Sequence, residues 1–208
     1  MNQPVIIVGA GGHAKVCIEL LQAMGETVLC CVGASDSAPT CLGLPVLQGD
    51  HHLARLRDEG HTRAFVALGP NRLRARLGWQ VRELGYELVN AISPAAVVSP
   101  SARLGAGVAV MAGAVINAEA SIGDLAIINT GASVDHDCSI GEAVHLAPQC
   151  ALAGNITVGA GTFLGVGCKV IPGIEIGAHA TVGAGAVVIG QIPPDVTAVG
   201  VPARVLHK

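Results

Sequence analysis

Side chains that could do chemistry gather in one short stretch of the sequence, SVDHDCSIGEAVHLAP, at residues 133–148. The tract around it, residues 92–193, otherwise consists mostly of aliphatic residues, alanine and glycine. Imidazole has the ordinary pKa closest to neutrality, so a histidine here is suited to take a proton from an attacking amine or hydroxyl. The stretch therefore predicts general-base chemistry. Its ionisable residues are Asp135, His136, Asp137, Glu142 and His145.

Two carboxylates flank His136, and either could fix its tautomer and favour its protonated form. Asp135 precedes it and Asp137 follows it. Three ionisable residues in a row are costly in an apolar tract, which favours a function over a plain turn. No cysteine or serine is suitably paired to act as a covalent nucleophile, so we expect a group to pass directly from donor to acceptor.

A strict hexapeptide period organises the tract that carries these residues. Every sixth residue from Ile92 to Val188 is aliphatic, at seventeen positions without a miss. Each hexapeptide can form one short strand and one bend, so a three-sided coil takes about 18 residues and coils stack about 4.8 Å apart. We predict a parallel β-helix over residues 92–193, followed by a C-terminal tail at residues 194–208. Cys150 and Cys168 are one coil length apart in the sequence and should stack as thiols in its core.

Residues 1–91 have a different pattern, which begins with a buried strand, a glycine turn and a helix in PVIIVGAGGHAKVCIELLQAMG. Gly9, Gly11 and Ala14 satisfy G-x-G-x-x-A, the turn that brings a phosphate to a helix N-terminus. The next strand, TVLCCVG, ends in Gly33 with only Asp36 beyond it, where a dinucleotide site would need an acidic residue. The missing acidic residue therefore argues against NAD as the ligand of this turn.

Further strands and helices alternate in this region, which indicates half of a Rossmann fold. Strands are expected at PVLQ, RAFVALG and ELVNAI, and helices at residues 52–59 and in RLRARLGWQVRELG. The arginines of the last helix could form a phosphate clamp, but we interpret them as a solvated face. They are Arg72, Arg74, Arg76 and Arg82.

Composition narrows the class of partner. The 208 residues carry a net charge of −3 and only 2% aromatic residues, which argues against nucleic acid. No apolar run approaches the roughly 18 residues of a membrane span, and no signal peptide is evident. Seven cysteines without a C-x-x-C pair indicate reduced core thiols and a cytoplasmic protein. We expect small-molecule partners.

The combination of GAGGHAKV, the hexapeptide tract, INTGASVDHDCSIGEAVHLAP and VGVPARVL resembles the bacterial sugar O-acyltransferase family over essentially the whole chain. That family includes sialic acid O-acetyltransferases and N-acetyltransferases of nucleotide-linked 4-amino-4,6-dideoxy sugars, as in the bacillosamine, perosamine and viosamine pathways. The resemblance implies a left-handed coil, a homotrimer with active sites between subunits, acetyl-CoA as co-substrate and no metal. It favours N-acetylation of a 4-amino sugar.

Site residues follow from the resemblance by motif position. His136 would be the base and Asp137 its partner, although family members often carry glutamate there. The acetyl-CoA contacts implied are His145 at the thioester, Val166 and Ala184 on the pantetheine arm, and Lys169, Arg204 and Lys208 as candidates for the phosphates. The nucleotide sugar would bind Gly11, Gly12, His13 and Gly69, with Asn129 at the acceptor.

Three other functions stay open at this point. A sialic acid O-acetyltransferase would use the same base on a hydroxyl acceptor. A zinc carbonic anhydrase on the same β-helix would need three histidines at a subunit interface, two of them close in sequence, whereas His136, His145 and His179 are widely separated. A scaffold without catalysis would use the repeat only as a rigid prism. The nucleotide, the sugar stereochemistry and the pathway are left open.

Overall fold

The computed structural model describes residues 3–206 in two compact units. The first unit ends at Pro94 and the second begins at Ala95, slightly beyond the boundary expected after residue 91. Within residues 3–206, no helix combines the length and the apolar character needed to cross a membrane.

The first unit is a parallel α/β domain with strand order β3-β4-β2-β1-β5-β6. Only the β3–β4 hairpin is antiparallel. This confirms the predicted half of a Rossmann fold. Its elements are β1 (Val5–Val8), α1 (Gly12–Ala23), β2 (Val28–Gly33), β3 (Thr40–Cys41), β4 (Leu44–Gln48), α2 (His51–Asp58), β5 (Arg63–Val66), α3 (Asn71–Glu83) and β6 (Glu87–Leu88), after which β7 (Ala91–Ile92) leads out of the domain.

The order of the strands in the sheet reverses at β1. β1 is fully buried and pairs with β2 on one side and β5 on the other. The chain therefore leaves β1 in one direction across the sheet and later returns in the other. In open parallel sheets, ligands bind at the carboxyl ends of the strands where the order reverses in this way.

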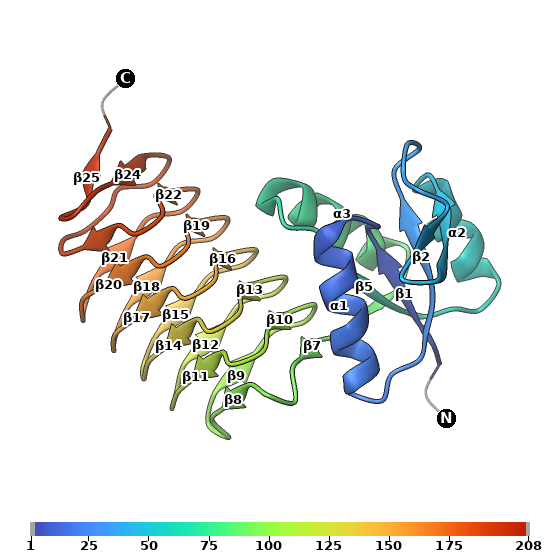
Figure 1. Ribbon diagram of the computed structural model, residues 1–208, viewed down its shortest axis with the longest axis horizontal. Coiled ribbons are helices and arrows are strands. Elements are labelled where there is room, and N and C mark those ends of the chain that lie inside the picture. Colours follow the sequence, from blue (N-terminus) through green and yellow to red (C-terminus); the bar gives the residue numbers. More distant parts are fainter. Residues whose placement is uncertain (1–2, 207–208) are drawn as a thin grey trace. The chain divides into compact units, whose positions relative to one another are not determined.

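The second unit is the left-handed parallel β-helix expected from the period and the resemblance. Its coils stack one on another in Figure 1. The first face holds β8 (Val97–Val98), β11 (Val115–Ile116), β14 (Ser133–Val134), β17 (Ala151–Leu152), β20 (Lys169–Val170) and β23 (Val187–Val188). The second holds β9 (Arg103–Leu104), β12 (Ser121–Ile122), β15 (Ser139–Ile140), β18 (Thr157–Val158) and β21 (Glu175–Ile176). The third holds β10 (Ala109–Val110), β13 (Ile127–Ile128), β16 (His145–Leu146), β19 (Phe163–Leu164), β22 (Thr181–Val182) and β24 (Thr197–Val199).

Pairing between coils has the register that the period predicts. Ser133 pairs with Val115 in the coil before and with Ala151 in the coil after, one coil length away in each direction. The aliphatic residues of the period are all buried from Val110 to Val188. The repeat therefore places one aliphatic side chain inside each face of each coil.

The cysteines fill small spaces in both cores, as predicted. All seven are buried and free. Cys150 donates its thiol to the carbonyl oxygens of Leu164 at 3.4 Å and Gly165 at 3.1 Å. Burial raises the pKa of Cys150 to about 11 and that of Cys168 to about 12, so both remain thiols at neutral pH.

Regular strands continue beyond residue 193, where the sequence suggests the end of the helix. β24 pairs in parallel with β22, through Thr181 and Thr197. β25 (Arg204–Val205) then turns back antiparallel to β24. These two strands extend the third face over much of the predicted tail.

Candidate active site

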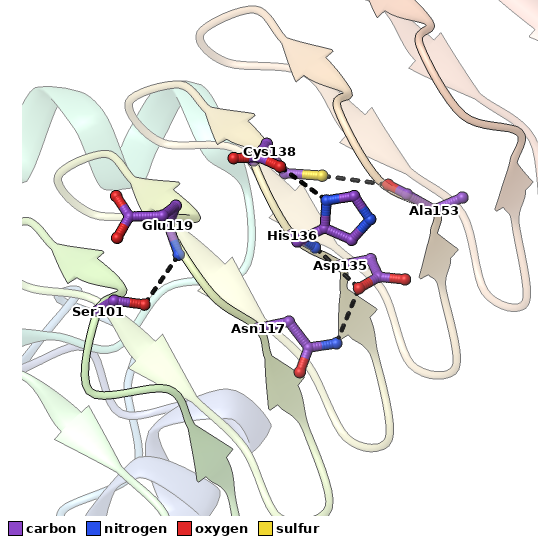
Figure 2. A network of polar contacts seen from close by, with 8 residues as sticks. Ser101, Asn117, Glu119, Asp135, His136, Cys138 and Ala153 are labelled. Atoms are coloured by element: carbon purple, nitrogen blue, oxygen red, sulfur yellow. Dashed lines mark hydrogen bonds and ion pairs between the residues drawn. The ribbon is translucent and has the colours of Figure 1, made fainter.

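The polar stretch folds into one corner of the β-helix. Residues 135–138 connect β14 to β15. Because residues one coil length apart stack on each other, the same corner holds residues 117–120 in the coil before and residues 153–156 in the coil after. Figure 2 shows the side chains of this corner, with Asn117, Asp135 and Ala153 at equivalent positions of three successive coils.

His136 and Asp137 are joined by a hydrogen bond at this corner. The His136 Nδ1 lies 2.7 Å from the Asp137 Oδ2, and the two side chains are 60% and 59% exposed. The hydrogen bond to Asp137, followed by the charge of Asp135, raises the pKa of His136 above its ordinary value. An ionised carboxylate can only accept, so Nδ1 carries the proton and Nε2 is left with its lone pair. Nε2 is therefore the atom that can act as a base.

Asp137 reaches the ring because of its backbone conformation. Its φ is 59°, in the left-handed region that aspartate and asparagine tolerate better than most residues. Its amide N–H donates to the carbonyl oxygen of Ala118 in the previous coil at 3.0 Å. A short side chain at this turn thus meets the imidazole of the residue before it.

Asp135 binds the backbone and the previous coil, not the imidazole. Its Oδ1 accepts from the amide nitrogen of Asn117 at 3.0 Å and from the backbone N–H of His136 at 2.8 Å. These hydrogen bonds lower the pKa of Asp135. Of the two flanking carboxylates, Asp137 therefore contacts the imidazole. Asp135 instead holds the backbone that carries the ring, through the His136 N–H, as Figure 2 shows.

Gly154 is a neighbour of the base that the sequence reasoning missed. It lies one coil after His136, and a Cβ built on it would be 2.6 Å from both Cε1 and Nε2 of the imidazole. Asn155 donates its N–H to the His136 carbonyl oxygen at 2.9 Å, and Cys138 donates its thiol to the Ala153 carbonyl oxygen at 3.2 Å. Their separation in the sequence by one coil length could have predicted that Gly154 stacks against His136.

His145 lies on β16, the third face, away from the corner of His136. Its Nε2 is 3.0 Å from the amide nitrogen of Asn129, which must be the donor, so this histidine is protonated on Nδ1. Its ring packs edge-on against Phe163, with ring centroids 5.2 Å apart. Asn129, which we predicted to contact the acceptor, thus orients the ring of His145. Glu142, the remaining ionisable residue of the stretch, lies at the corner between β15 and β16.

The predicted coenzyme residues lie on later coils. Val166 and Ala184 occupy the same corner of adjacent coils, both exposed, and Gly185 donates its N–H to the Val166 carbonyl oxygen at 2.8 Å. Lys169 is exposed on β20 and Arg204 is exposed on β25. Lys208 lies outside the described residues.

A pocket of 380 Å³ opens in the first unit at the carboxyl ends of β1, β2 and β5. Gly9, Gly33 and Leu68 line it at the three strand ends. This is the edge at which the strand order reverses, and the volume is in the range of small-ligand sites. Gly11 and Gly12 follow on the chain and are exposed at the start of α1.

Arg74 corrects the interpretation of the α3 arginines as a solvated face. It is only 1% exposed, and its guanidinium donates to the carbonyl oxygens of Leu68 at 3.0 Å and Gly69 at 2.7 Å and to the Asn71 Oδ1 at 2.9 Å. The loop between β5 and α3 turns these acceptors inward, so they require an internal donor. Burial and the charge of Arg74 lower the pKa of His13 to about 4, which leaves His13 neutral at neutral pH.

Metal ligands are not grouped in the part of the chain that the structure describes. Across residues 3–206, no three histidine, cysteine, aspartate or glutamate side chains gather in a way that could hold a metal ion.

Comparison with known proteins extends these observations. A family model described as the PglD N-terminal domain matches residues 4–80. A crystal structure of a mutant GDP-perosamine N-acetyltransferase from Caulobacter crescentus, in complex with CoA and GDP-perosamine, is 56% identical in sequence with a TM-score of 0.97. The match covers 100% of this chain and 99% of that one.

Two further structures match along nearly the full chain. The acetyltransferase domain of PglB from Neisseria gonorrhoeae FA1090, in complex with acetyl coenzyme A, is 38% identical with a TM-score of 0.92, covering 99% of this chain and 100% of that one. WeeI from Acinetobacter baumannii AYE is 26% identical with a TM-score of 0.90, again covering 99% of this chain and 100% of that one.

Proposed function

The chain belongs to the hexapeptide family of bacterial sugar acetyltransferases, and from this premise we propose that it transfers the acetyl group of acetyl-CoA to the 4-amino group of a nucleotide-linked 4-amino-4,6-dideoxy sugar. The observation that carries the proposal is the His136–Asp137 pair at 2.7 Å, in a chain that is 56% identical over its whole length to an N-acetyltransferase bound to CoA and GDP-perosamine. The sugar in that complex is the acceptor class we propose here.

The chemistry is a direct transfer with His136 Nε2 as the base. The neutral 4-amino group attacks the thioester carbonyl carbon, and as the new C–N bond forms an N–H proton passes to Nε2. The tetrahedral intermediate then expels the CoA thiolate with cleavage of the C–S bond, and the imidazolium returns the proton to the sulfur. Asp137 keeps the proton on Nδ1 and stabilises the imidazolium between these steps.

The other site residues take roles consistent with their positions. Asn129 orients His145, which we place near the acetyl thioester. Val166 and Ala184 contact the pantetheine arm through their backbone, since both are exposed at one corner. Lys169 and Arg204 are exposed cations on later coils that can meet the coenzyme phosphates.

We also propose that the enzyme is a cytoplasmic homotrimer acting in glycan biosynthesis, with its active sites between subunits. In a single chain the side chains of His136 and Asp137 are 60% and 59% exposed, so a neighbouring subunit could complete the site around them. A water-excluded site would strengthen the electrostatic interactions of the pair. Sedimentation analysis of the purified protein tests the trimer.

Thiol release from acetyl-CoA tests the reaction and its base together. The acceptors are GDP-, UDP- and dTDP-linked 4-amino-4,6-dideoxy sugars and free sialic acid, with His136→Ala beside the wild type and calorimetric CoA binding as the folding control. We expect turnover on one amino sugar that falls by about 10²-fold or more in the variant. Turnover on sialic acid alone would reassign the enzyme to O-transfer. Failure to bind CoA would overturn the acetyltransferase proposal.

A further inference from the structure

The pocket in the first unit contains two charged residues in an otherwise mainly apolar lining. Asp50 comes from the end of the β4–α2 turn and Arg76 from α3. Apolar side chains from β1, β2, the β5–α3 loop and α3 make up much of the rest: Val8, Val32, Leu68, Leu73 and Leu77. An apolar slot with two charges of opposite sign suits a flat heterocycle that is polar at its edges.

Asp50 is not used by its own helix. It occupies the N-cap position of α2, where an aspartate commonly caps the helix, yet its side chain makes no capping hydrogen bond. The Asp50 residue is exposed and lines the pocket. Its backbone is helical, with φ and ψ of −62° and −19°. The residue before it, Gly49, donates its N–H to the Gly33 carbonyl oxygen at 2.8 Å, which joins the ends of β4 and β2. The carboxylate is thus positioned by the sheet and available to a ligand.

A carboxylate and a guanidinium distinguish nucleobases by the hydrogen-bonding pattern of each base. Guanine presents two adjacent donors, N1–H and the 2-amino group, and on its other edge two acceptors, O6 and N7. A carboxylate accepts from both donors at once, and an arginine donates to both acceptors. Uracil and thymine present a single N–H between two carbonyl oxygens that repel a carboxylate, and adenine presents one donor beside a ring acceptor.

Resting on the function proposed above, we propose that Asp50 determines the nucleotide specificity of this enzyme by reading the donor edge of guanine, with Arg76 donating to the acceptor edge. The sugar substrate is therefore GDP-linked. The GDP-perosamine bound by the Caulobacter crescentus enzyme agrees with this assignment. The pocket adjoins the glycine turn at Gly9, so the base would occupy the pocket while the diphosphate leads toward Gly11 and Gly12 at the start of α1.

Calorimetric binding of three probes, GDP, IDP and UDP, tests the assignment without catalysis. IDP lacks only the 2-amino group, so it removes one of the two donors to Asp50. We expect the wild type to prefer GDP over IDP by about tenfold and over UDP by more, and Asp50→Asn to lose about 5- to 150-fold in GDP affinity, as for a bidentate base contact. Discrimination between GDP and IDP should collapse in the variant.

Asp36→Asn is the matched control, because Asp36 is an exposed carboxylate on the neighbouring β2–β3 connection and is not among the residues that line the pocket. It should bind GDP, IDP and CoA like the wild type, and Asp50→Asn should keep wild-type CoA affinity. Unchanged GDP and IDP affinities in Asp50→Asn, or a wild type that prefers UDP, would overturn the specificity assignment. A wild type that binds GDP with Asp50 dependence but transfers no acetyl group would instead overturn the proposed function.

Discussion

Replacing Gly154 with alanine should disable the base while leaving the fold intact. The added methyl group would lie 2.6 Å from Cε1 and Nε2 of His136 and 3.2 Å from its Cδ2. Favourable carbon contacts begin at about 3.5 Å, so the atoms must separate by about 1 Å. The clash is with the far end of a side chain, not with backbone. The imidazole is therefore the group that moves.

The size of the effect follows from this displacement. The His136–Asp137 bond is 2.7 Å long, and a shift of about 1 Å would carry it past the limit of about 3.2 Å for a good hydrogen bond. Misplacing a catalytic group by about 1 Å can lower the rate about 100-fold. We therefore expect kcat/KM to fall by about 10²-fold. The acidic limb of its pH profile should also move to lower pH, because the contact that raises the pKa of His136 is weakened.

The Gly154→Ala variant should lose activity without losing stability. The backbone of Gly154 is outside the left-handed region, and a Gly→Ala change at a compatible site often stabilises a protein by about 0.4–1 kcal/mol. Gly190→Ala is the matched control, because Gly190 occupies the equivalent position two coils later and a Cβ there meets nothing within 4 Å. Steady-state kinetics, CoA calorimetry and thermal melts compare the three proteins. Wild-type kcat/KM and pH profile in a folded Gly154→Ala would refute the reasoning.

Three further substitutions address other contacts. Asp137→Asn removes the main cause that raises the pKa of His136, so the acidic limb of kcat/KM should shift to lower pH and the plateau should fall at least about tenfold; an unchanged limb contradicts this. Arg74→Met leaves three acceptors without their buried donor, so urea titration should show about 3 kcal/mol less unfolding free energy, and a loss below about 1 kcal/mol contradicts it. Because the pKa of folded His13 is lowered to about 4, the unfolded state binds more protons below pH 6.5, and stability falls by up to about 3 kcal/mol from pH 6.5 to 4. His13→Gln should reduce this loss in urea titrations at both ends of the range, and identical pH dependence would contradict it.

Much of the fold could be predicted because its signals are local and repeated. One aliphatic residue in every six fixes the length of a coil, and the coil length in turn sets the pairing of Ser133 with Ala151. The strands and helices of the first unit can likewise be predicted from the sequence, because each run of apolar residues ends in glycine or a polar turn. The continuation of the sheet through β24 was not predicted, because strict hexapeptides stop before it and pairing with β22 depends on the preceding coil.

The site was only partly predictable, for a physical reason. His136 and its adjacent carboxylates are neighbours in sequence, so their proximity needed no fold. Choosing between Asp135 and Asp137 required the previous coil, since Asn117 and the His136 N–H engage Asp135 and leave the imidazole to Asp137. The interpretation of Arg74 as a solvated residue was wrong. The periodicity of its helix does not show that carbonyl groups of the preceding loop point inward and bind the guanidinium.

The glycines of this β-helix cannot be told apart by the sequence pattern, but a side chain is excluded at different positions by different neighbours. At Gly141, on the corner between β15 and β16, an added Cβ would lie 2.7 Å from the backbone nitrogen of Ala160 in the next coil. That backbone belongs to the ladder of hydrogen bonds between coils and cannot withdraw without breaking it. At Gly154 the obstacle is the ring of His136, which can move at no cost to the ladder. Substitution at Gly141 should therefore destabilise the fold, whereas substitution at Gly154 removes a catalytic orientation, and only a comparison of melting with turnover distinguishes the two.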